Sequence, residues 1–167
     1  KDSATHVVSM PTDDFLSNEK SAIVSNEQAG SFKIVFENRE GLQSILKDGL
    51  NISVGTVVDA TFMNVETLRR FIAEQLADAK AKDILFSVHL KATMMKVADP
   101  IVFGQVVLVL LQDFIDKHKK TLDSLGFNPN LGLSDLEQRI ASLATDQRSE
   151  LESDLATTLA DQPRLYM

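Results

Sequence analysis

The chain has 167 residues, of which 44% are hydrophobic, so it is long and apolar enough to bury a core and does not have the composition of a disordered protein. Its 24 acidic and 17 basic residues give a net charge of −7, which argues against an unspecific nucleic-acid or anionic-membrane surface. The absence of cysteine excludes disulfides and cysteine-ligated zinc, and makes the cytoplasm the expected location.

The longest apolar stretch, residues 101–111, is interrupted by Gly104 and Gln105 and falls short of the roughly 20 residues that span a bilayer. We therefore expect no membrane anchor, and no basic and apolar leader opens the chain. The chain begins at Lys1 rather than at a methionine, so we expect it to be a piece of a longer protein. Surfaces that pack against the missing parts would then appear as exposed apolar patches.

The first 63 residues alternate apolar and polar side chains in short runs, which is typical of strands. Turn chemistry at residues 38–41 and at Asp48-Gly49 separates these runs and predicts an antiparallel meander. We predict strands over residues 32–36, 42–46, 50–54 and 56–62, with an additional one over 6–10.

At Asn64 the apolar period changes from two to about 3.6, which predicts a helix capped by Asn64. Glu66 in its first turn, and Lys80 and Lys82 in its last, suit the helix dipole. An apolar strand over residues 84–90 follows, and a right-handed crossover is expected if it runs parallel to the strand before the helix.

Asp99-Pro100 predicts the start of a long helix, because aspartate caps free backbone N–H groups and proline fits the first helical position. We predict that this helix ends at Gly126 and that its first half is apolar nearly all round, so it is buried on several sides or lies in an interface. Its valines also fit a strand, but the bracketing caps favour the helix. Ser134 opens a capping box for a helix to about Leu143, and Thr145 caps another toward Ala160.

These elements predict a mixed α/β fold, with an antiparallel-rich sheet from the N-terminal half packed with helices. The whole chain, residues 1–167, is expected to form a single domain or a fragment of one. Within it, residues 1–63 are mainly strands, 64–97 hold a helix, a strand and the bend at Lys91, and 98–160 are helices.

Lys91 is the candidate catalytic residue. Strand parity places Leu85, Ser87, His89 and Lys91 on one face, so Lys91 continues a polar line at the end of a buried strand. An ammonium that loses hydration there is shifted toward its neutral form, which suits proton transfer or imine chemistry. The alternative is a solvated lysine that marks where the chain leaves the core. His89 is more simply explained as a hydrogen-bonded structural residue, because no other histidine has metal-ligand spacing.

Other polar groups favour structural explanations. The basic run at residues 117–120 lies on a predicted helix without interleaved aromatics and is interpreted as a solvated face. Met94 and Met95 fit adaptable core filler, and Asp13-Asp14 lies in a loop without a nearby base. The sequence contains no Gly-rich phosphate loop and no serine nucleophile elbow, so a complete cofactor-binding enzyme is not visible in these residues.

A continuous motif surrounds the candidate lysine: Ser87-Val88-His89-Leu90-Lys91-Ala92-Thr93-Met94-Met95-Lys96, followed by Asp99-Pro100-Ile101 and Phe103-Gly104-Gln105. In this motif the chain resembles the single-chain, monomeric type of NADP-dependent isocitrate dehydrogenase. The resemblance extends more loosely over most of the chain, through Asn64, Leu68, Arg69-Phe71-Ile72, Gly126-Phe127-Asn128, Gly132, Asp135-Leu136 and Arg139-Ile140.

The resemblance implies an isocitrate/isopropylmalate dehydrogenase-like fold, of which this chain is an interior piece from the domain that closes over the substrate. It implies oxidative decarboxylation of isocitrate to 2-oxoglutarate and CO2, with NADP and Mg²⁺ or Mn²⁺. Lys91 matches the family lysine that moves protons with a tyrosine from elsewhere; Tyr166 does not match that tyrosine. The metal carboxylates and NADP pocket have no match here, so we expect the isolated chain to be inactive.

Two alternatives remain open on the residues alone. One is a noncatalytic interaction module that docks or self-associates through the apolar helix over residues 100–125. The other is an enzyme that uses Lys91 as a Schiff-base nucleophile.

Overall fold

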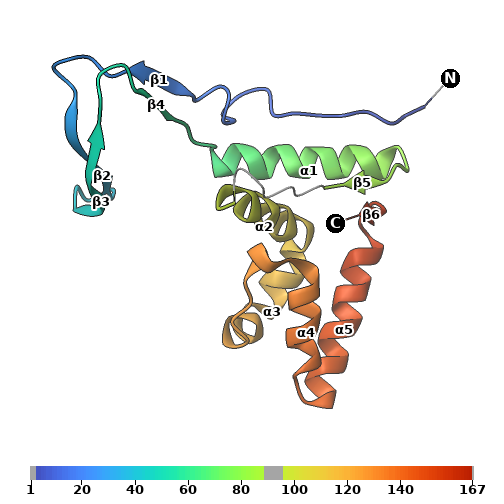
Figure 1. Cartoon of the computed structure of the whole chain (residues 1–167). Coiled ribbons are helices and arrows are strands. Elements are labelled where there is room, and N and C mark those ends of the chain that lie inside the picture. The colour runs from blue at the N-terminus through green and yellow to red at the C-terminus, as the bar shows by residue number, and fades with distance from the viewer. Residues whose placement is uncertain (1–2, 89–95, 167) are drawn as a thin grey trace. The chain divides into compact units, whose positions relative to one another are not determined.

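The computed structural model describes residues 3–88 and 96–166 and has a mixed α/β architecture (Figure 1). The chain divides into two units, which we describe separately. Residues 12–63 form the strand unit, and residues 1–11 with 64–167 form the helical unit. In the described part of the chain the strands form two-stranded ladders and the helical unit holds five α-helices, α1 to α5.

A long hairpin dominates the strand unit. Strand β2 (Gly30–Glu37) pairs antiparallel with β3 (Gln43–Ile52), and Asn38 Oδ1 accepts from the backbone N–H groups of Glu40 and Leu42 at 2.9 Å in the turn. The predicted turn at Asp48-Gly49 is wrong, because β3 continues through it. Gly49, at φ 68°, instead lies where the register shifts, and so forms part of a β-bulge that only glycine adopts easily.

The second ladder of the strand unit joins β1 (Lys20–Ile23) to β4 (Val57–Ala60), again antiparallel. The expected single meander is therefore wrong: distant segments pair, and β1 was missed because Lys-Ser-Ala-Ile has little strand pattern. The strand predicted over residues 6–10 is also wrong. These residues have no regular structure, and Val7 is 98% exposed.

The strand unit buries little of its apolar surface. Among its described residues only Val24 is a buried large hydrophobic side chain, at 5% exposure. Large side chains along both ladders remain half open to solvent, including Ile34, Phe36, Ile45, Val57 and Phe62. Apolar side chains exposed over several strands are typical of a surface that packs against another part of a protein or a partner.

Helix α1 (Val65–Ala81) confirms the prediction made from the period change at Asn64. The Asn64 side chain accepts from the backbone N–H groups of Glu66 at 3.0 Å and Thr67 at 3.1 Å. Its buried stripe has the predicted helical spacing and consists of Leu68, Ile72, Leu76 and Ala79. A cap of this kind stabilises a helix by about 1 kcal/mol.

The single long helix predicted over residues 100–125 is wrong, because it breaks at Leu111 into α2 (Ala98–Leu110) and α3 (Gln112–Ser124), bent by 104°. Leu111 has φ −108° and ψ 20° and is fully buried. In a straight helix, the apolar first half and the apolar face of the second half could not both pack into the same core. Because of the bend, Val107, Leu110 and Phe114 are all buried.

The sequence predicted where helices occur along the chain better than the residue at which each helix begins. Helix α2 begins at Ala98 with Val97 at the cap, so Asp99 lies in the first turn rather than at the cap. In the described chain no single helix is long and apolar enough to cross a membrane; only α2 and α3 together reach that length, and they are sharply bent.

The chain then forms a short 3₁₀ helix, η1 (Pro129–Leu131), followed by α4 (Gly132–Ala141) and α5 (Thr145–Ala160). Ser134 does not cap α4, which starts two residues earlier because η1 leads directly into it. Thr145 is the first helical residue of α5 rather than its cap, and the predicted end at Ala160 is confirmed. Leu136, Ile140, Leu151 and Leu155 bury the apolar stripes of these helices.

The strand predicted over residues 84–90 is described only in part, as β5 (Phe86–Ser87). It pairs in parallel with β6 (Leu165–Tyr166), so its partner is this C-terminal strand rather than the strand before α1. The predicted alternation holds over the described residues: Ile84, Phe86 and Val88 are half-buried, whereas Leu85 and Ser87 are exposed.

Gly104 allows η1 to approach α2 closely. A Cβ on Gly104 would lie 2.0 Å from Asn130 Oδ1 and 3.1 Å from the Asn130 backbone nitrogen. Both distances are shorter than van der Waals contact, so a larger residue at this position would force the Asn130 side chain to move and its backbone to shift slightly.

We predict that Gly104→Ala destabilises the protein. Overpacking costs about 1–3 kcal/mol, and replacing glycine within a helix returns up to about 1 kcal/mol, so the net loss is about 1 kcal/mol, or about 2–4 °C in Tm. Thermal unfolding of Gly104→Ala, Asn130→Ala and the double variant measures this. The double variant should recover part of the loss, and a Gly104→Ala variant more stable than the parent would contradict the close contact.

Candidate functional site

Lys91 and His89, the residues singled out from the sequence, lie outside the described residues, so the structure leaves the prediction for both untested. What it does describe is the frame on either side of them. Strand β5 and Val88 come before the segment of residues 89–95, and Lys96, Val97 and α2 follow it. The elements that flank this segment determine where its two ends lie.

Before the segment, the chain is tied to the C-terminal strand. The backbone N–H of Phe86 donates to Arg164 O at 2.7 Å, and that of Val88 donates to Tyr166 O at 3.0 Å. Arg164 Nη2 also donates to Asp83 O at 2.9 Å, just after α1. These bonds fix the direction in which the chain enters the segment, and they require α5 and β6 to be in place.

After the segment, α2 is held on several sides. Arg69 Nε on α1 donates to Gln105 Oε1 at 2.6 Å. Asn130 lies against Gly104 on another side, and a Cβ on Gly132 would lie 3.3 Å from the ring of Phe103. The motif residues Phe103, Gly104 and Gln105 therefore make the contacts that position the start of α2.

Residues that carry the resemblance farther along the chain also make contacts that hold these elements together. Asn128 Oδ1 accepts from Asn130 N at 3.0 Å and so shapes η1. Arg139 donates to Asp135 Oδ2 at 2.5 Å and to Leu125 O at 2.6 Å, which joins α4 to the end of α3. The hydrogen bond to Asp135 raises the pKa of Arg139, so the guanidinium stays charged at every working pH.

A hollow of ≈ 460 Å³ lies beside β5. It is bounded by residues 5–8, by α1 at Gln75, Asp78 and Ala79, and by residues 84–87. Its one carboxylate is Asp78, which pairs with Lys82 at 2.7 Å and with His6 at 3.5 Å. The hydrogen bond from Lys82 is the main reason that the pKa of Asp78 lies below its ordinary value. The hollow thus has one carboxylate whose charge is already balanced.

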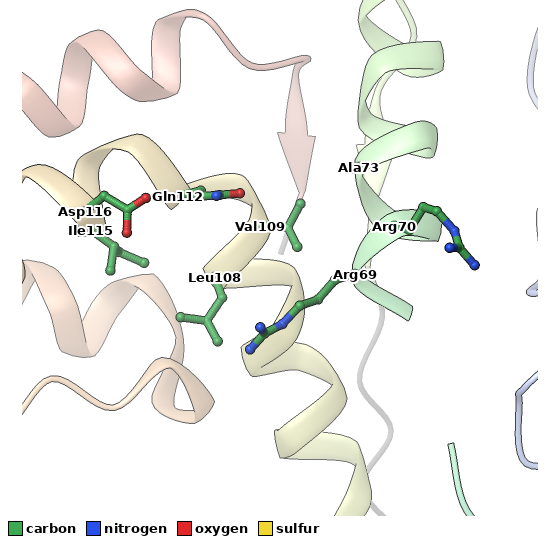
Figure 2. A pocket seen from close by; sticks show the side chains of 8 residues that line it. All are labelled: Arg69, Arg70, Ala73, Leu108, Val109, Gln112, Ile115 and Asp116. Carbon is green, nitrogen blue, oxygen red and sulfur yellow. The ribbon is translucent and has the colours of Figure 1, made fainter. Parts of the chain in front are cut away.

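A second hollow, also of ≈ 460 Å³, lies between α1, α2 and α3 (Figure 2). Arg69, Arg70, Gln112 and Asp116 are its polar lining. Figure 2 shows Arg69 extending toward α2 and Arg70 pointing away from the other lining residues. Because Arg69 already donates to Gln105 and Asp116 adds negative charge, this hollow does not form a strong anion site.

Besides these two hollows, a cluster of charged and polar side chains, which the sequence analysis missed, joins α3 to α5. Residues 117–120 were interpreted as a solvated face, and Lys117 and Lys119 are indeed exposed, but His118 is only 7% exposed. His118 lies four residues after Phe114 and four before Leu122, on the buried stripe of α3. This spacing was the signal in the sequence that could have revealed its burial.

Asp154 on α5 is the partner of this histidine. Its Oδ2 atom lies 2.6 Å from His118 Nε2 and 2.6 Å from Lys117 Nζ. The hydrogen bond from Lys117, and then that from His118, lower the pKa of Asp154 below its ordinary value of 3.8. The hydrogen bond between Lys117 and Asp154 also raises the pKa of Lys117. The charged forms of both groups are therefore stabilised by folding.

This pair predicts a pH dependence. Since the folded-state pKa of Asp154 is lowered from 3.8, its stabilising effect is complete above that value and is lost as the pH falls through the lower, folded-state pKa. Urea unfolding of the protein and of Asp154→Asn should show a clear stability difference at about pH 6 that shrinks by about pH 3. An equal difference at both pH values would mean that the carboxylate charge does not contribute.

The described residues show few groups that could hold a cofactor. NADP phosphates need clustered backbone N–H donors or free cations, but the sequence has no Gly-rich loop and Arg69 is engaged. The oxygen-rich site that Mg²⁺ or Mn²⁺ prefers does not fit either, since in the described part His118, Glu150 and Asp154 are the one group that could hold a metal ion.

Comparison with known proteins explains why the site is partial. A model of the monomeric isocitrate dehydrogenase family matches residues 1–167 of the chain. The chain belongs to the monomeric isocitrate dehydrogenase family.

Three relatives show how much of such a protein is present. The isocitrate dehydrogenase (NADP) of Azotobacter vinelandii is 40% identical over 166 residues, which are 99% of this chain and 22% of the relative. Isocitrate dehydrogenase (NADP) 2 of Colwellia maris is 37% identical over 167 residues, and isocitrate dehydrogenase (NADP) 2 of Mycobacterium tuberculosis is 39% identical over 165. These alignments cover 100% and 99% of the chain, and 22% of each relative. The chain thus spans about a fifth of these members of the monomeric isocitrate dehydrogenase family.

Proposed function

We propose that this chain is part of an NADP-dependent isocitrate dehydrogenase, which oxidatively decarboxylates isocitrate to 2-oxoglutarate and CO2, and that Lys91 is its proton-transfer lysine. The observation that carries the proposal is the family match over residues 1–167, which includes the motif around Lys91. The relatives named above carry NADP isocitrate dehydrogenase in their names.

The described frame supports this role for Lys91 on physical grounds. A catalytic amine must be held in position, because misplacement by about 1 Å can cost about 10²-fold in rate. The segment of residues 89–95 follows a strand bonded to β6 and precedes a helix held by Arg69 and Asn130. Both ends of the segment are therefore fixed by packing and backbone hydrogen bonds, as a positioned lysine requires.

In the same proposal, the other parts of the site belong to the rest of the full-length protein. These parts are the NADP pocket, the carboxylates for Mg²⁺ or Mn²⁺ and the partner tyrosine, and the isolated chain is inactive without them. We further propose an isocitrate/isopropylmalate dehydrogenase-like fold for the complete domain, of which residues 1–167 are a fragment, and a cytoplasmic location.

The alternatives are not favoured by the family match. The interaction module relied on an exposed apolar helix, but α2 and the residue after it are buried at Val106, Val107, Leu110 and Leu111. If the isolated chain self-associates, the exposed apolar side chains of the strand unit offer the larger surface. A Schiff-base mechanism would be revealed by borohydride trapping of a carbonyl substrate on Lys91.

We predict that Lys91→Met, made in the full-length protein, lowers kcat by about 10²- to 10⁴-fold, the usual contribution of a positioned proton-transfer group. NADP binding and thermal stability should be unchanged, because Lys91 is proposed to act on the substrate. Steady-state kinetics and NADP titration measure these effects. Lys120→Met is the matched control, since this exposed lysine of α3 lies outside the motif and should keep normal turnover.

Near-normal turnover of Lys91→Met would overturn the role of the lysine. A loss of NADP binding together with turnover would instead indicate that the substitution disturbs the fold.

A further inference from the structure

We propose that His118, Glu150 and Asp154 form a binding site for a zinc-like divalent transition-metal ion that joins α3 to α5. One ligand atom from each residue, the imidazole nitrogen and a carboxylate oxygen from each acid, lies within 4.8 Å of the other two. This inference uses residues that the proposed dehydrogenase reaction does not use, so it stands or falls independently of that function.

The backbone brings the three ligands together. Glu150 and Asp154 are four residues apart on α5, so both side chains leave the same face of that helix. His118 reaches this face from α3, at the position where the backbone of α3 departs from helical geometry, with φ −105° and ψ 16°. Phe114 lies against the imidazole, with ring centroids 5.0 Å apart, and limits its orientation.

The chemistry of the ligands indicates which ion would fit. Imidazole nitrogen and carboxylate oxygen are both ligands that Zn²⁺ accepts, with bonds of about 2.0–2.2 Å, and three such ligands leave a fourth position for water. Mg²⁺ prefers oxygen ligands in octahedral geometry and fits less well. Ligand atoms within 4.8 Å of one another need only small side-chain rotations to close around one ion.

The group already holds a cation in this structure. Lys117 Nζ lies 2.6 Å from Asp154 Oδ2, the same oxygen that His118 contacts. Lys117 extends from the exposed side of α3, with 56% of its side chain accessible, so it can swing away into solvent. A bound metal ion would replace this ammonium at Asp154 Oδ2 and take the place of the hydrogen bond between His118 and Asp154.

Such an ion would act on the frame of the candidate site. Helix α5 leads directly into β6, and β6 pairs with β5 just before residues 89–95. Joining α5 to α3 by a metal ion would therefore stabilise the strand pair next to Lys91. The role of the ion is structural, and it does not take part in the reaction.

The test measures zinc binding to the full-length protein after treatment with a chelator. Zinc chloride is titrated by equilibrium dialysis with Mg²⁺ in excess, so that sites with oxygen ligands are occupied by Mg²⁺. Glu150→Gln removes a ligand from an exposed position without disturbing the core and should weaken the site at least about tenfold. Lys117→Met removes the competing ammonium and should strengthen it severalfold.

Glu152→Gln is the matched control, because Glu152 lies on the same helix and pairs with Arg148 instead. It should bind zinc as the parent does. Without zinc, the thermal stability of Glu150→Gln and Glu152→Gln should stay close to that of the parent, whereas Lys117→Met loses the ion pair with Asp154. The proposal is overturned if Glu150→Gln binds as much zinc, with the same affinity, as the parent protein. It is also overturned if Lys117→Met binds zinc no more tightly than the parent.

Discussion

The buried bend between α2 and α3 is the constraint on which the rest of the helical unit depends. Leu110 and Leu111 are almost completely buried at this bend, and Phe114 follows on the next turn. Helix α2 contacts α1, η1, α3 and α4, and these contacts bury Val106, Val107 and Leu110. Full burial of a leucine or phenylalanine stabilises by about 1.5–3 kcal/mol, which is more than any single surface ion pair here can contribute.

Contacts from distant parts of the chain hold the elements on either side of residues 89–95. The start of α2 is held by Gln105 against Arg69 and by Gly104 against Asn130, while the strand before the segment is held by β6. Residues 89–95 thus connect two elements that are fixed by contacts with distant parts of the chain. The strand unit differs: its apolar side chains are largely exposed, as in a part that packs against other segments of a longer protein.

The sequence predicted the elements whose signals are local. The α1 helix follows from its Asn64 cap and its 3.6-residue stripe, and the β2–β3 hairpin from its alternation and turn. The break at Leu111 could not be predicted, because the packing of the whole unit, rather than a local proline or glycine, bends the chain there. The pairing of β1 with β4, and of His118 with Asp154, depends on long-range contacts that no local pattern records. Lys91 was predicted from strand parity and motif and lies outside the described residues; the strand before it is held by β6, which is far away in the sequence.

In the proposed function, the elements on either side of residues 89–95 present the amine of Lys91 to the substrate. The most direct measurement is a crystal structure of the full-length protein with isocitrate bound. The account predicts that Lys91 Nζ lies within hydrogen-bond distance, about 3 Å, of the isocitrate hydroxyl, in a site partly closed to water. An amine that points into bulk solvent, with another side chain in contact with that hydroxyl, would contradict it.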